Sequence, residues 1–350
     1  MNKVFVRALN NLCRQELSKS LTQATRYAST FKAAVIKEQA QPLEIVEKTQ
    51  RKLKPTEVRV EVNYCSVNSV DCYKFRKGGG ELPFVPGYEL SGEVLEVGKD
   101  VKADQINVGE KVVGLNLESF GGLAQQCILD IDDVFRIPSE VSRKDAAVIA
   151  YGHSTALYTF SKLTNIKEKS KVVISTGPAG MGLAAVDVAA NIYKAEVIGV
   201  VDTEERGELV RERGAFTTVH FSPKMTKEIL KKTDNKGAPT VYDAAGEDMM
   251  QIIGNCVAVG GKTFYASPFF FTTIPAPVPH SFSSIVSLKI LRTQNKHLYK
   301  TIVNDTLELA NESLIGAHIS AEFSLDKIND AIKFIEDKKC TGKVLIKIDD

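Results

Sequence analysis

The stretch that most constrains the fold is KVVISTGPAGMGLAAVDVAANIYKAEVIGVVD, residues 171–202. It contains an apolar run at 172–174, a glycine-rich turn, an apolar segment with helical spacing at 183–192 and a second apolar run at 197–201. Short apolar runs bounded by glycine predict buried strands, and a helix between two such strands predicts a βαβ unit. The sequence therefore predicts the start of a parallel sheet.

The alternation of helix and strand patterns continues beyond this unit. Helices are expected at about 203–214 and 225–232, and strands at 218–221, 240–246 and 261–267. The last segment, 320–348, predicts a strand, a helix capped near 324–326 and a final strand. The fold class is therefore α/β, with a wound parallel sheet in this part of the chain.

The preceding part of the chain, from residue 31 to about 140, has a different pattern. Short segments of apolar residues, separated by glycine and proline turns, predict six strands at 31–37, 43–48, 57–67, 91–98, 110–115 and 124–130. Their short and regular spacing favours an antiparallel, barrel-like domain.

The first 29 residues carry five basic residues and one acidic residue, with apolar residues at helical spacing. That composition is typical of a mitochondrial transit peptide, so we expect residues 1–29 to direct the chain to the matrix. An ordinary N-terminal extension is the alternative. Without this segment the chain has 40 basic and 42 acidic residues, a net charge that gives no reason to expect nucleic-acid binding.

The cysteines and the apolar runs exclude other classes of protein. The six cysteines, at positions 13, 65, 72, 127, 256 and 340, include no CxxC pair. This spacing suits a reducing compartment and favours thiols that simply pack in the fold. No apolar run approaches the roughly 20 residues that span a bilayer. No membrane span is therefore expected.

The glycine-rich turn GPAGMG suggests a ligand. Glycines between a strand and a helix let the backbone approach a pyrophosphate, and the helix N-terminus offers free N–H groups. A dinucleotide is the expected ligand, although a turn that merely packs tightly would look the same, and Ala179 stands where the strict motif has glycine. The expected cofactor-binding residues are Gly177, Pro178, Ala179, Gly180, Met181, Gly182, Asp202, Arg206 and Gly246.

Asp202 and Arg206, which follow the second strand of the unit, bear on the choice of dinucleotide. Asp202 stands 20 residues beyond Gly182, where an acid hydrogen-bonds the adenosine ribose and repels a 2′-phosphate. Arg206 lies close by in the sequence and could instead pair with that phosphate. The residues alone leave NAD and NADP open.

Several segments together resemble a known superfamily. They are SVNSVDCYKFRKG, LPFVPGYELSGEVLEVG, STALYTF, GPAGMGLAAVDVAANI and KINDAIKFIEDKKCTGKVLI. They are similar to the medium-chain dehydrogenase/reductases and, within them, to the zinc-free quinone oxidoreductase branch. The resemblance covers residues 31–348. It implies a GroES-like substrate domain at 31–150, completed by 300–350, and a Rossmann domain at 151–299. It also implies NADPH as cofactor and a homodimer that pairs through the edge of the Rossmann sheet.

The same resemblance addresses metal binding. In zinc-containing relatives, ligands stand at the positions of Asn68 and Tyr88, as a cysteine and a histidine. A carboxamide and a phenol do not replace thiolate and imidazole as zinc ligands, and Glu89 alone does not hold the metal. The protein is therefore expected to be metal-free, with Cys65 and Cys72 flanking the position without forming a new site.

A site without a Lewis acid favours an acceptor that takes hydride readily, such as a quinone or an α,β-unsaturated carbonyl. By resemblance, the catalytic candidates are Asn68, Tyr73 and Thr155. Asn68 would donate through its amide, Tyr73 would offer a phenolic hydroxyl, and Thr155 would lie near the nicotinamide. The alternatives are a satisfied turn residue for Asn68, a strand-edge aromatic for Tyr73 and a helix-start hydroxyl for Thr155.

The role of one segment and the function of the protein each have more than one interpretation. The segment 266–282, rich in proline and aromatic residues, predicts an irregular hydrophobic loop that caps an apolar substrate, forms a subunit contact or is a buried connector. The leading hypothesis is a mitochondrial, metal-free NAD(P)H-dependent reductase. The alternative is a catalytically weak NAD(P)H-binding redox sensor or scaffold, and nucleic-acid binding is a third and less favoured function.

Overall fold

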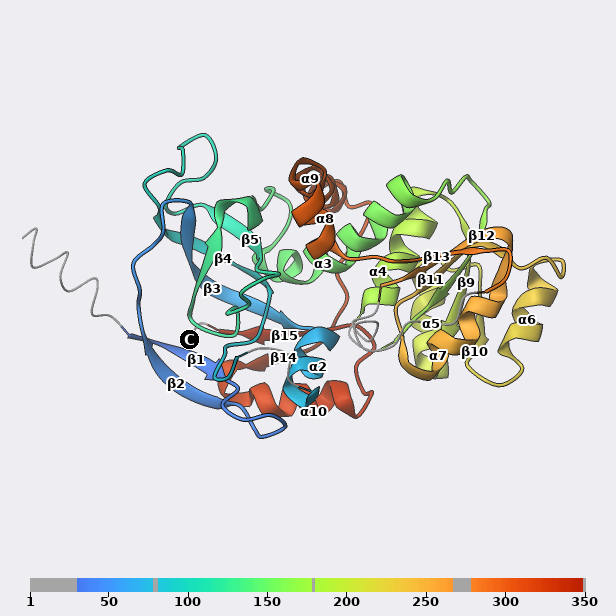
Figure 1. Ribbon diagram of the computed structural model, residues 1–350, viewed down its shortest axis with the longest axis horizontal. Helices are drawn as coiled ribbons and strands as arrows, with labels where there is room; N and C mark the ends of the chain where they lie inside the picture. The colour runs from blue at the N-terminus through green and yellow to red at the C-terminus, as the bar shows by residue number, and fades with distance from the viewer. Residues whose placement is uncertain (1–29, 78–80, 178–179, 267–277, 349–350) are drawn as a thin grey trace, which may run out of the picture.

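The computed structural model describes residues 30–77, 81–177, 180–266 and 278–348. The predicted transit peptide, Pro178, Ala179 and residues 267–277 of the predicted loop lie outside the described residues. Figure 1 shows two lobes side by side, each built around its own sheet. Both sheets match the predicted fold class, one largely antiparallel and one parallel.

The first domain is a largely antiparallel sheet with strand order β14-β15-β3-β4-β5-β7, and β6 pairs with β3. Two C-terminal strands complete it, because β15 pairs antiparallel with β3 and parallel with β14. The buried core comes from the apolar residues of β3 and β4 and from one face of α10, which carries Ile328, Ile332 and Ile335. The element bounds are β1 Thr30–Val35, β2 Glu44–Thr49, β3 Glu57–Val67, α2 Ser69–Lys77, β4 Glu89–Val97, β5 Lys111–Leu115, β6 Gln126–Asp130, β7 Val134–Arg136, β14 Ile319–Ser324, α10 Ile328–Glu336 and β15 Lys343–Lys347.

The second domain is a parallel sheet with strand order β10-β9-β8-β11-β12-β13. The chain leaves β8 toward β9 on one side and returns to β11 on the other, so the strand order reverses between β8 and β11. Ligands of open parallel sheets bind at such a reversal, beyond the carboxyl ends of the strands. The bounds are β8 Lys171–Ser175, α4 Met181–Asp187, β9 Glu196–Val201, α5 Glu204–Glu212, β10 Thr217–His220, α6 Met225–Lys232, β11 Ala238–Asp243, α7 Glu247–Ile253, β12 Val257–Tyr265 and β13 Phe282–Ile285.

Most predicted elements are present, with two local differences. The predicted helix 183–192 is split, because α4 passes into a π-helical segment, Val188–Ile192. Phe282, placed at the end of the predicted loop, begins the short edge strand β13. A four-residue strand with every side chain exposed has no alternating burial pattern that a sequence could reveal.

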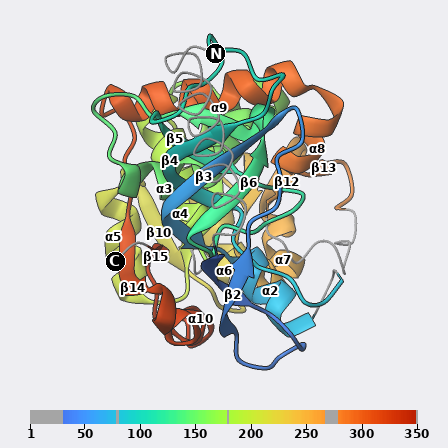
Figure 2. The same cartoon turned by 90° about the vertical axis from the view of Figure 1, so that its left-hand side faces the viewer.

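Three helices join the domains: α3 (Arg143–Tyr158), α8 (Leu288–Gln294) and α9 (Lys296–Asn311). In the side view of Figure 2, α8 and α9 lie at one side of the first domain and α10 at the other. Helix α3 packs against α9 and α4 and reaches β4.

The described helices include none with the length and apolarity that crossing a bilayer requires.

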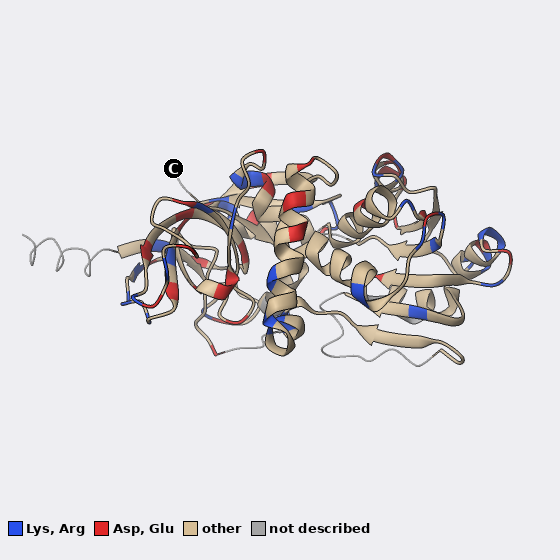
Figure 3. Cartoon of the chain, turned by 90° about the horizontal axis from the view of Figure 1, so that it is seen from above, with Lys and Arg blue, Asp and Glu red and all other residues tan. Residues whose placement is uncertain are grey.

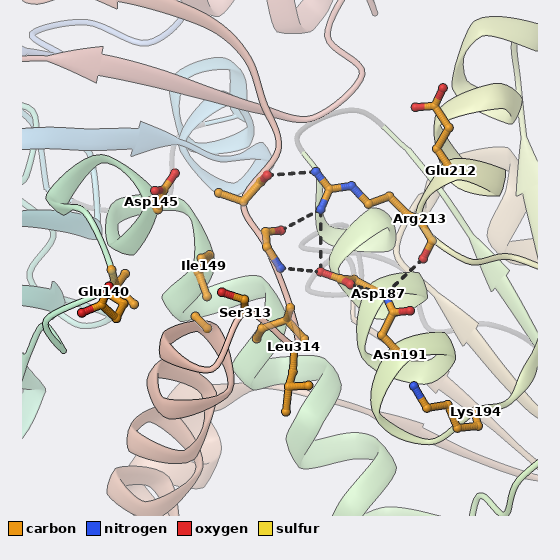
Figure 4. Close-up of a pocket in the computed structure, with 15 residues that line it drawn as sticks. Glu140, Asp145, Ile149, Asp187, Asn191, Lys194, Glu212, Arg213, Ser313 and Leu314 are labelled. Carbon is orange, nitrogen blue, oxygen red and sulfur yellow. Dashed lines mark hydrogen bonds and ion pairs between the residues drawn. The ribbon is translucent and has the colours of Figure 1, made fainter.

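A cavity of about 690 Å³ lies beside the segment that links α9 to β14 (Figure 4). The guanidinium of Arg213 donates to the carbonyl oxygens of Gly316 and Ala317 at 3.1 and 2.9 Å. The Gly316 N–H donates to Asp187 at 2.9 Å, and Asp187 also contacts His153. These contacts hold the segment between α9 and β14 against the second domain. They therefore help to set how the two domains face each other.

Candidate active site

The glycine-rich turn follows β8 at the reversal of strand order. A Cβ added to Gly182 would lie 2.3 Å from the carbonyl oxygen of Ser175, and one added to Gly177 would lie 2.9 Å from the Cα of Ala245. Gly180 has a positive φ of 77°, and its Cβ would lie 3.0 Å from the backbone nitrogen of Lys343. Glycine at these positions therefore lets the turn lie closely against the neighbouring backbone, as the glycine turn of a dinucleotide-binding unit does. We call residues 177–182 the cradle. Met181 begins α4 directly after Gly180.

The end of β11 braces the other side of the turn. The hydroxyl of Ser175 donates to Asp243 at 2.5 Å, and the Gly246 N–H donates to the same carboxylate at 3.2 Å. Burial raises the pKa of Asp243, although these hydrogen bonds oppose the shift. Gly177 and Gly246 therefore lie on the ends of adjacent strands.

The two residues that bear on cofactor choice are paired with each other. A guanidinium nitrogen of Arg206 donates to Asp202, and the other donates to the carbonyl oxygens of Lys338 and Cys340. The Arg206 side chain is buried, whereas that of Asp202 is partly exposed at the end of β9. Arg206 therefore anchors the C-terminal segment to the second domain, and Asp202 is the member of the pair that a ribose can reach.

Glu89, the first residue of β4, is the hub of a buried polar cluster and has no exposed surface. Its carboxylate accepts from four donors: Ser66 Oγ at 2.6 Å, Asn68 Nδ2 at 3.2 Å, the Tyr151 backbone N–H at 2.8 Å and Lys343 Nζ at 2.9 Å. Lys343 also donates to the Asn68 carboxamide oxygen. We call these residues the Glu89 cluster. It ties β3, the start of α2, α3 and β15 together next to the glycine turn.

The three predicted catalytic residues differ in what they offer a ligand. Asn68 is buried, and its amide nitrogen already donates to Ser66 and Glu89. Thr155 is buried in the last turn of α3, where its hydroxyl donates to the Tyr151 carbonyl oxygen at 2.8 Å. Tyr73 is partly buried on α2, so it is not on a strand edge.

The residues at this position do not fit a zinc ion. Asn68 and Tyr88 are weak donors for zinc, and the Glu89 carboxylate is already bound to an ammonium group. The positive charge of Lys343 would also repel a divalent cation there. The described part of the chain contains no group of three or more His, Cys, Asp or Glu residues that could hold a metal. The five cysteines in it are buried.

Asp71 lies beneath the cluster, on the first turn of α2. Its carboxylate accepts the N–H of Asn68 at 2.9 Å and that of Gly87 at 2.8 Å. Burial raises its pKa from 3.8 to about 6, although these two hydrogen bonds oppose the rise. Because the folded-state pKa is the higher one, the proton stabilises the folded state. That stabilisation is complete below about pH 4 and is lost as the pH rises through about 6.

This shift predicts a measurable pH dependence of stability. The free energy of unfolding of the wild type, minus that of Asp71→Asn, should fall by about 2 kcal/mol between pH 4 and pH 7. Urea denaturation at several pH values measures it, and the subtraction removes the titration of all other groups. A difference that stays constant or rises over this range would contradict the assigned pKa shift.

Sequence reasoning missed most of the Glu89 cluster. Lys343 begins a strand and Ser66 is the last but one residue of another, and neither has a neighbour in the sequence that marks it as functional. Lys343 and Glu89 are 254 residues apart. The one available signal is a lysine at the start of an otherwise apolar strand, because a buried lysine needs a charged partner.

The comparisons with known proteins agree with this architecture. Residues 54–139 match the family described as alcohol dehydrogenase GroES-like domain, and residues 180–310 match zinc-binding dehydrogenase. The chain is 32% identical over 329 residues to quinone oxidoreductase-like protein 2 of Mus musculus, covering 91% of this chain and 92% of that protein. A 2-haloacrylate reductase from Burkholderia is 30% identical over 231 residues, which cover 61% of this chain and 68% of that protein.

A solved structure supports the same fold. The Escherichia coli quinone oxidoreductase complexed with NADPH aligns with a TM-score of 0.81 at 20% identity, covering 91% of this chain and 99% of that one. The curated relative from mouse exceeds this identity over nearly the full length of both proteins. The chain therefore belongs to the medium-chain dehydrogenase/reductase superfamily, in the family of quinone oxidoreductase-like protein 2.

Proposed function

We propose that this protein is an NAD(P)H-dependent oxidoreductase that transfers a hydride to a quinone or an α,β-unsaturated carbonyl compound. The single observation that carries the proposal is the place where the domains meet. There the glycine turn after β8 lies directly against the first residues of β15, which bring Lys343 to the Glu89 cluster. A dinucleotide cradle and a polar, buried cluster thus share one boundary.

The chain's own residues have distinct parts in this reaction. Gly177, Gly180 and Gly182 let the turn pack closely on the neighbouring backbone, as a turn that binds a pyrophosphate does, and Asp202 accepts from a ribose hydroxyl. When bound, the nicotinamide cofactor supplies the hydride. The Glu89 cluster holds the floor of the site rigid, because its buried ammonium and carboxylate groups pair with each other and with Asn68.

The names of the relatives support this substrate class. The mouse relative is named quinone oxidoreductase-like protein 2, the E. coli neighbour is a quinone oxidoreductase, and the Burkholderia relative is a 2-haloacrylate reductase. Quinones and conjugated carbonyls place the incoming charge on an oxygen atom, which hydrogen bonds and a nearby cation stabilise without a metal.

We favour NADPH over NADH as the cofactor. The E. coli neighbour was solved with NADPH. The ion pair with Arg206 offsets the charge of Asp202, which would otherwise repel a 2′-phosphate. The sign of this effect is testable, because Asp202→Asn should raise the affinity for NADPH more than that for NADH.

The direct test uses the purified chain from residue 31 onward. Fluorescence titration with NADPH and NADH should show saturable binding of both, with NADPH tighter. Addition of 9,10-phenanthrenequinone or crotonaldehyde should then oxidise the bound cofactor repeatedly. The proposal fails if neither dinucleotide binds, or if binding is never followed by oxidation.

One observation favours the second function, a redox sensor or scaffold that binds NAD(P)H. The amide hydrogens of Asn68 and the hydroxyl hydrogen of Thr155 are already used within the protein. In this arrangement the Asn68 amide, one of the two expected donors, has no hydrogen left for a substrate, and neither has the Thr155 hydroxyl. Tight dinucleotide binding without oxidation by any quinone or enone would support this function instead. Figure 3 shows basic and acidic residues intermixed along the described chain of both domains.

We also propose a homodimer formed through β13. This strand is the edge of the parallel sheet, and within the described ranges no strand pairs with its outer side. Phe282 and Ile285 on it are 67% and 41% exposed, and an exposed apolar edge strand favours pairing with another chain. Sedimentation should give twice the 38.3 kDa chain mass. Phe282→Asp should yield monomer, whereas Phe216→Asp, on an equally exposed residue at the opposite edge, should not.

Residues 1–29 are proposed as a matrix-targeting segment. The support is their basic, amphipathic composition. A fusion of these residues to a fluorescent protein should enter mitochondria. A fusion in which the five basic residues are replaced by glutamine should remain outside, and equal localisation of the two fusions would contradict the proposal.

A further inference from the structure

The polar atoms around the Glu89 cluster are almost all occupied. Both amide hydrogens of Asn68 are used, the Thr155 hydroxyl donates to a carbonyl, and the Glu89 carboxylate accepts four hydrogen bonds. A substrate oxygen that gains negative charge needs a donor whose hydrogen is still available. A donor among the neighbours of the cluster would meet this need.

Two tyrosines next to the cluster have available hydroxyl groups. Tyr88 precedes Glu89, and the backbone N–H of Tyr151 donates to the Glu89 carboxylate. The two rings pack edge to face with centroids 4.9 Å apart, and Tyr88 packs in the same way against Phe120 at 5.6 Å. Neither phenolic oxygen has a hydrogen-bond partner among the residues that the structure describes, and neither is one of the enclosed, unpartnered atoms.

The position of the pair relative to the glycine turn follows from three successive contacts. Gly180 of the turn lies against the backbone of Lys343, the Lys343 ammonium donates to Glu89, and Glu89 accepts the N–H of Tyr151. Tyr151 is partly exposed, while Tyr88 behind it is 2% exposed. Tyr151 is thus the phenol closer to open space, and Tyr88 supports its ring.

The surroundings of the pair define the substrate it suits. Tyr88 belongs to an apolar cluster with Leu117, Phe120 and Leu288, and Tyr151 packs against the same cluster. An apolar wall with hydroxyl donors fits a flat, apolar compound that carries a carbonyl oxygen. Burial raises the pKa of both phenols, so both keep their protons at neutral pH and serve as donors, not as bases.

We infer that Tyr151, supported by Tyr88, is the hydrogen-bond donor that stabilises the oxyanion of the reduced quinone or enone. The inference rests on the proposed function, because it names the residue that donates a hydrogen bond to the substrate oxyanion in that reaction. The acceptor carbon or oxygen takes the hydride and the electron pair, and the negative charge moves to the oxygen that faces Tyr151. Tyr151 keeps its proton throughout, and solvent water supplies the proton of the product.

Steady-state kinetics with NADPH and 9,10-phenanthrenequinone provide the first arm of the test. Tyr151→Phe should lower kcat on the order of 100-fold, with KM and NADPH affinity nearly unchanged. Tyr88→Phe should lower it less. Tyr193→Phe, a half-buried tyrosine packed edge to face on Phe160 in the second domain, is the matched control and should retain full activity. All three variants should unfold at the wild-type temperature.

The second arm needs no turnover. A 4-nitrophenolate ion mimics the oxyanion, and its binding to the protein saturated with NADP⁺ is followed by its absorbance. Wild type and Tyr193→Phe should bind it equally, and Tyr151→Phe should bind it about tenfold more weakly. If Tyr151→Phe binds 4-nitrophenolate more weakly but the wild type shows no turnover, the result supports Tyr151 as the hydrogen-bond donor and contradicts the reductase function.

The opposite pattern is equally decisive. The test compares Tyr151→Phe and the double variant Tyr88→Phe/Tyr151→Phe with the wild type. If kcat and 4-nitrophenolate binding are unchanged in both, the role of Tyr151 as donor is contradicted, while the reductase function stands. A wild type that binds neither NADPH nor 4-nitrophenolate would overturn both.

Discussion

Replacement of Glu89 by alanine is expected to lower the free energy of unfolding by about 3–5 kcal/mol. Glu89 and Lys343 are both buried, and the carboxylate accepts four hydrogen bonds. Loss of the carboxylate leaves a buried ammonium without its counter-charge and also frees the donors of Ser66 and Asn68. A buried charge without a partner is one of the few single changes that cost this much.

The double variant Glu89→Ala/Lys343→Met separates this cause from simple loss of packing. Removal of both charges should restore part of the stability, so the two single changes should be strongly non-additive. Glu44→Ala is the matched control, since Glu44 pairs with Lys37 at 2.5 Å while both side chains are about half exposed. It should cost no more than about 1 kcal/mol. A Glu89→Ala cost as small as that of the control, measured by urea denaturation, would contradict the assigned role of the cluster.

Gly182→Ala is expected to weaken NADPH binding by about tenfold or more, equivalent to about 1.4 kcal/mol or more. Its Cβ would lie 2.3 Å from the carbonyl oxygen of Ser175 and 2.7 Å from the Cα of Thr176. Both are backbone atoms of the preceding strand, so the clash is relieved only when the start of α4 moves away from β8. That movement changes the cradle in which the pyrophosphate is expected to bind.

Gly207→Ala provides the matched control for this change. Gly207 lies in α5 of the same domain, and a Cβ there would meet its nearest atom, in the Arg211 side chain, at an ordinary distance of 3.4 Å. It should leave NADPH affinity unchanged and stabilise the helix by up to about 1 kcal/mol. Fluorescence titration of the two variants under the same conditions makes the comparison. Equal affinity of Gly182→Ala and the wild type would argue that the turn only packs the helix on the sheet.

The sequence predicts the framework of the fold because its signals are local. Apolar runs bounded by glycine gave β8, β9 and β11, and alternating short segments gave β1 to β6. The helices α2, α3, α7, α8 and α9 had no prediction. Helix α3 includes the segment AAVIAYGH and is buried on several sides, so it lacks the one-sided apolar stripe that marks a surface helix.

The candidate site was less predictable because its contacts are distant in the sequence. The glycine turn and Asp202 lie within one βαβ unit, so their proximity follows from the unit itself. The pairing of Arg206 with the carbonyl oxygens of Lys338 and Cys340 joins segments more than 130 residues apart. The same holds for Lys343 with Glu89. Only the fold shows that Arg206 is occupied and that the Asn68 amide has no hydrogen left to donate.

The most direct test of the proposed hydride transfer follows one isotope. The wild-type protein is incubated with NADPH that carries deuterium on the transferable position of C4, together with an α,β-unsaturated ketone, and the product is examined by NMR. The structure predicts a saturated ketone with one deuteron on the β-carbon and a solvent-derived proton on the α-carbon. Stoichiometric binding of the labelled NADPH with no deuterium in any product, from enones or quinones, would contradict a reductase and favour a dinucleotide-binding sensor.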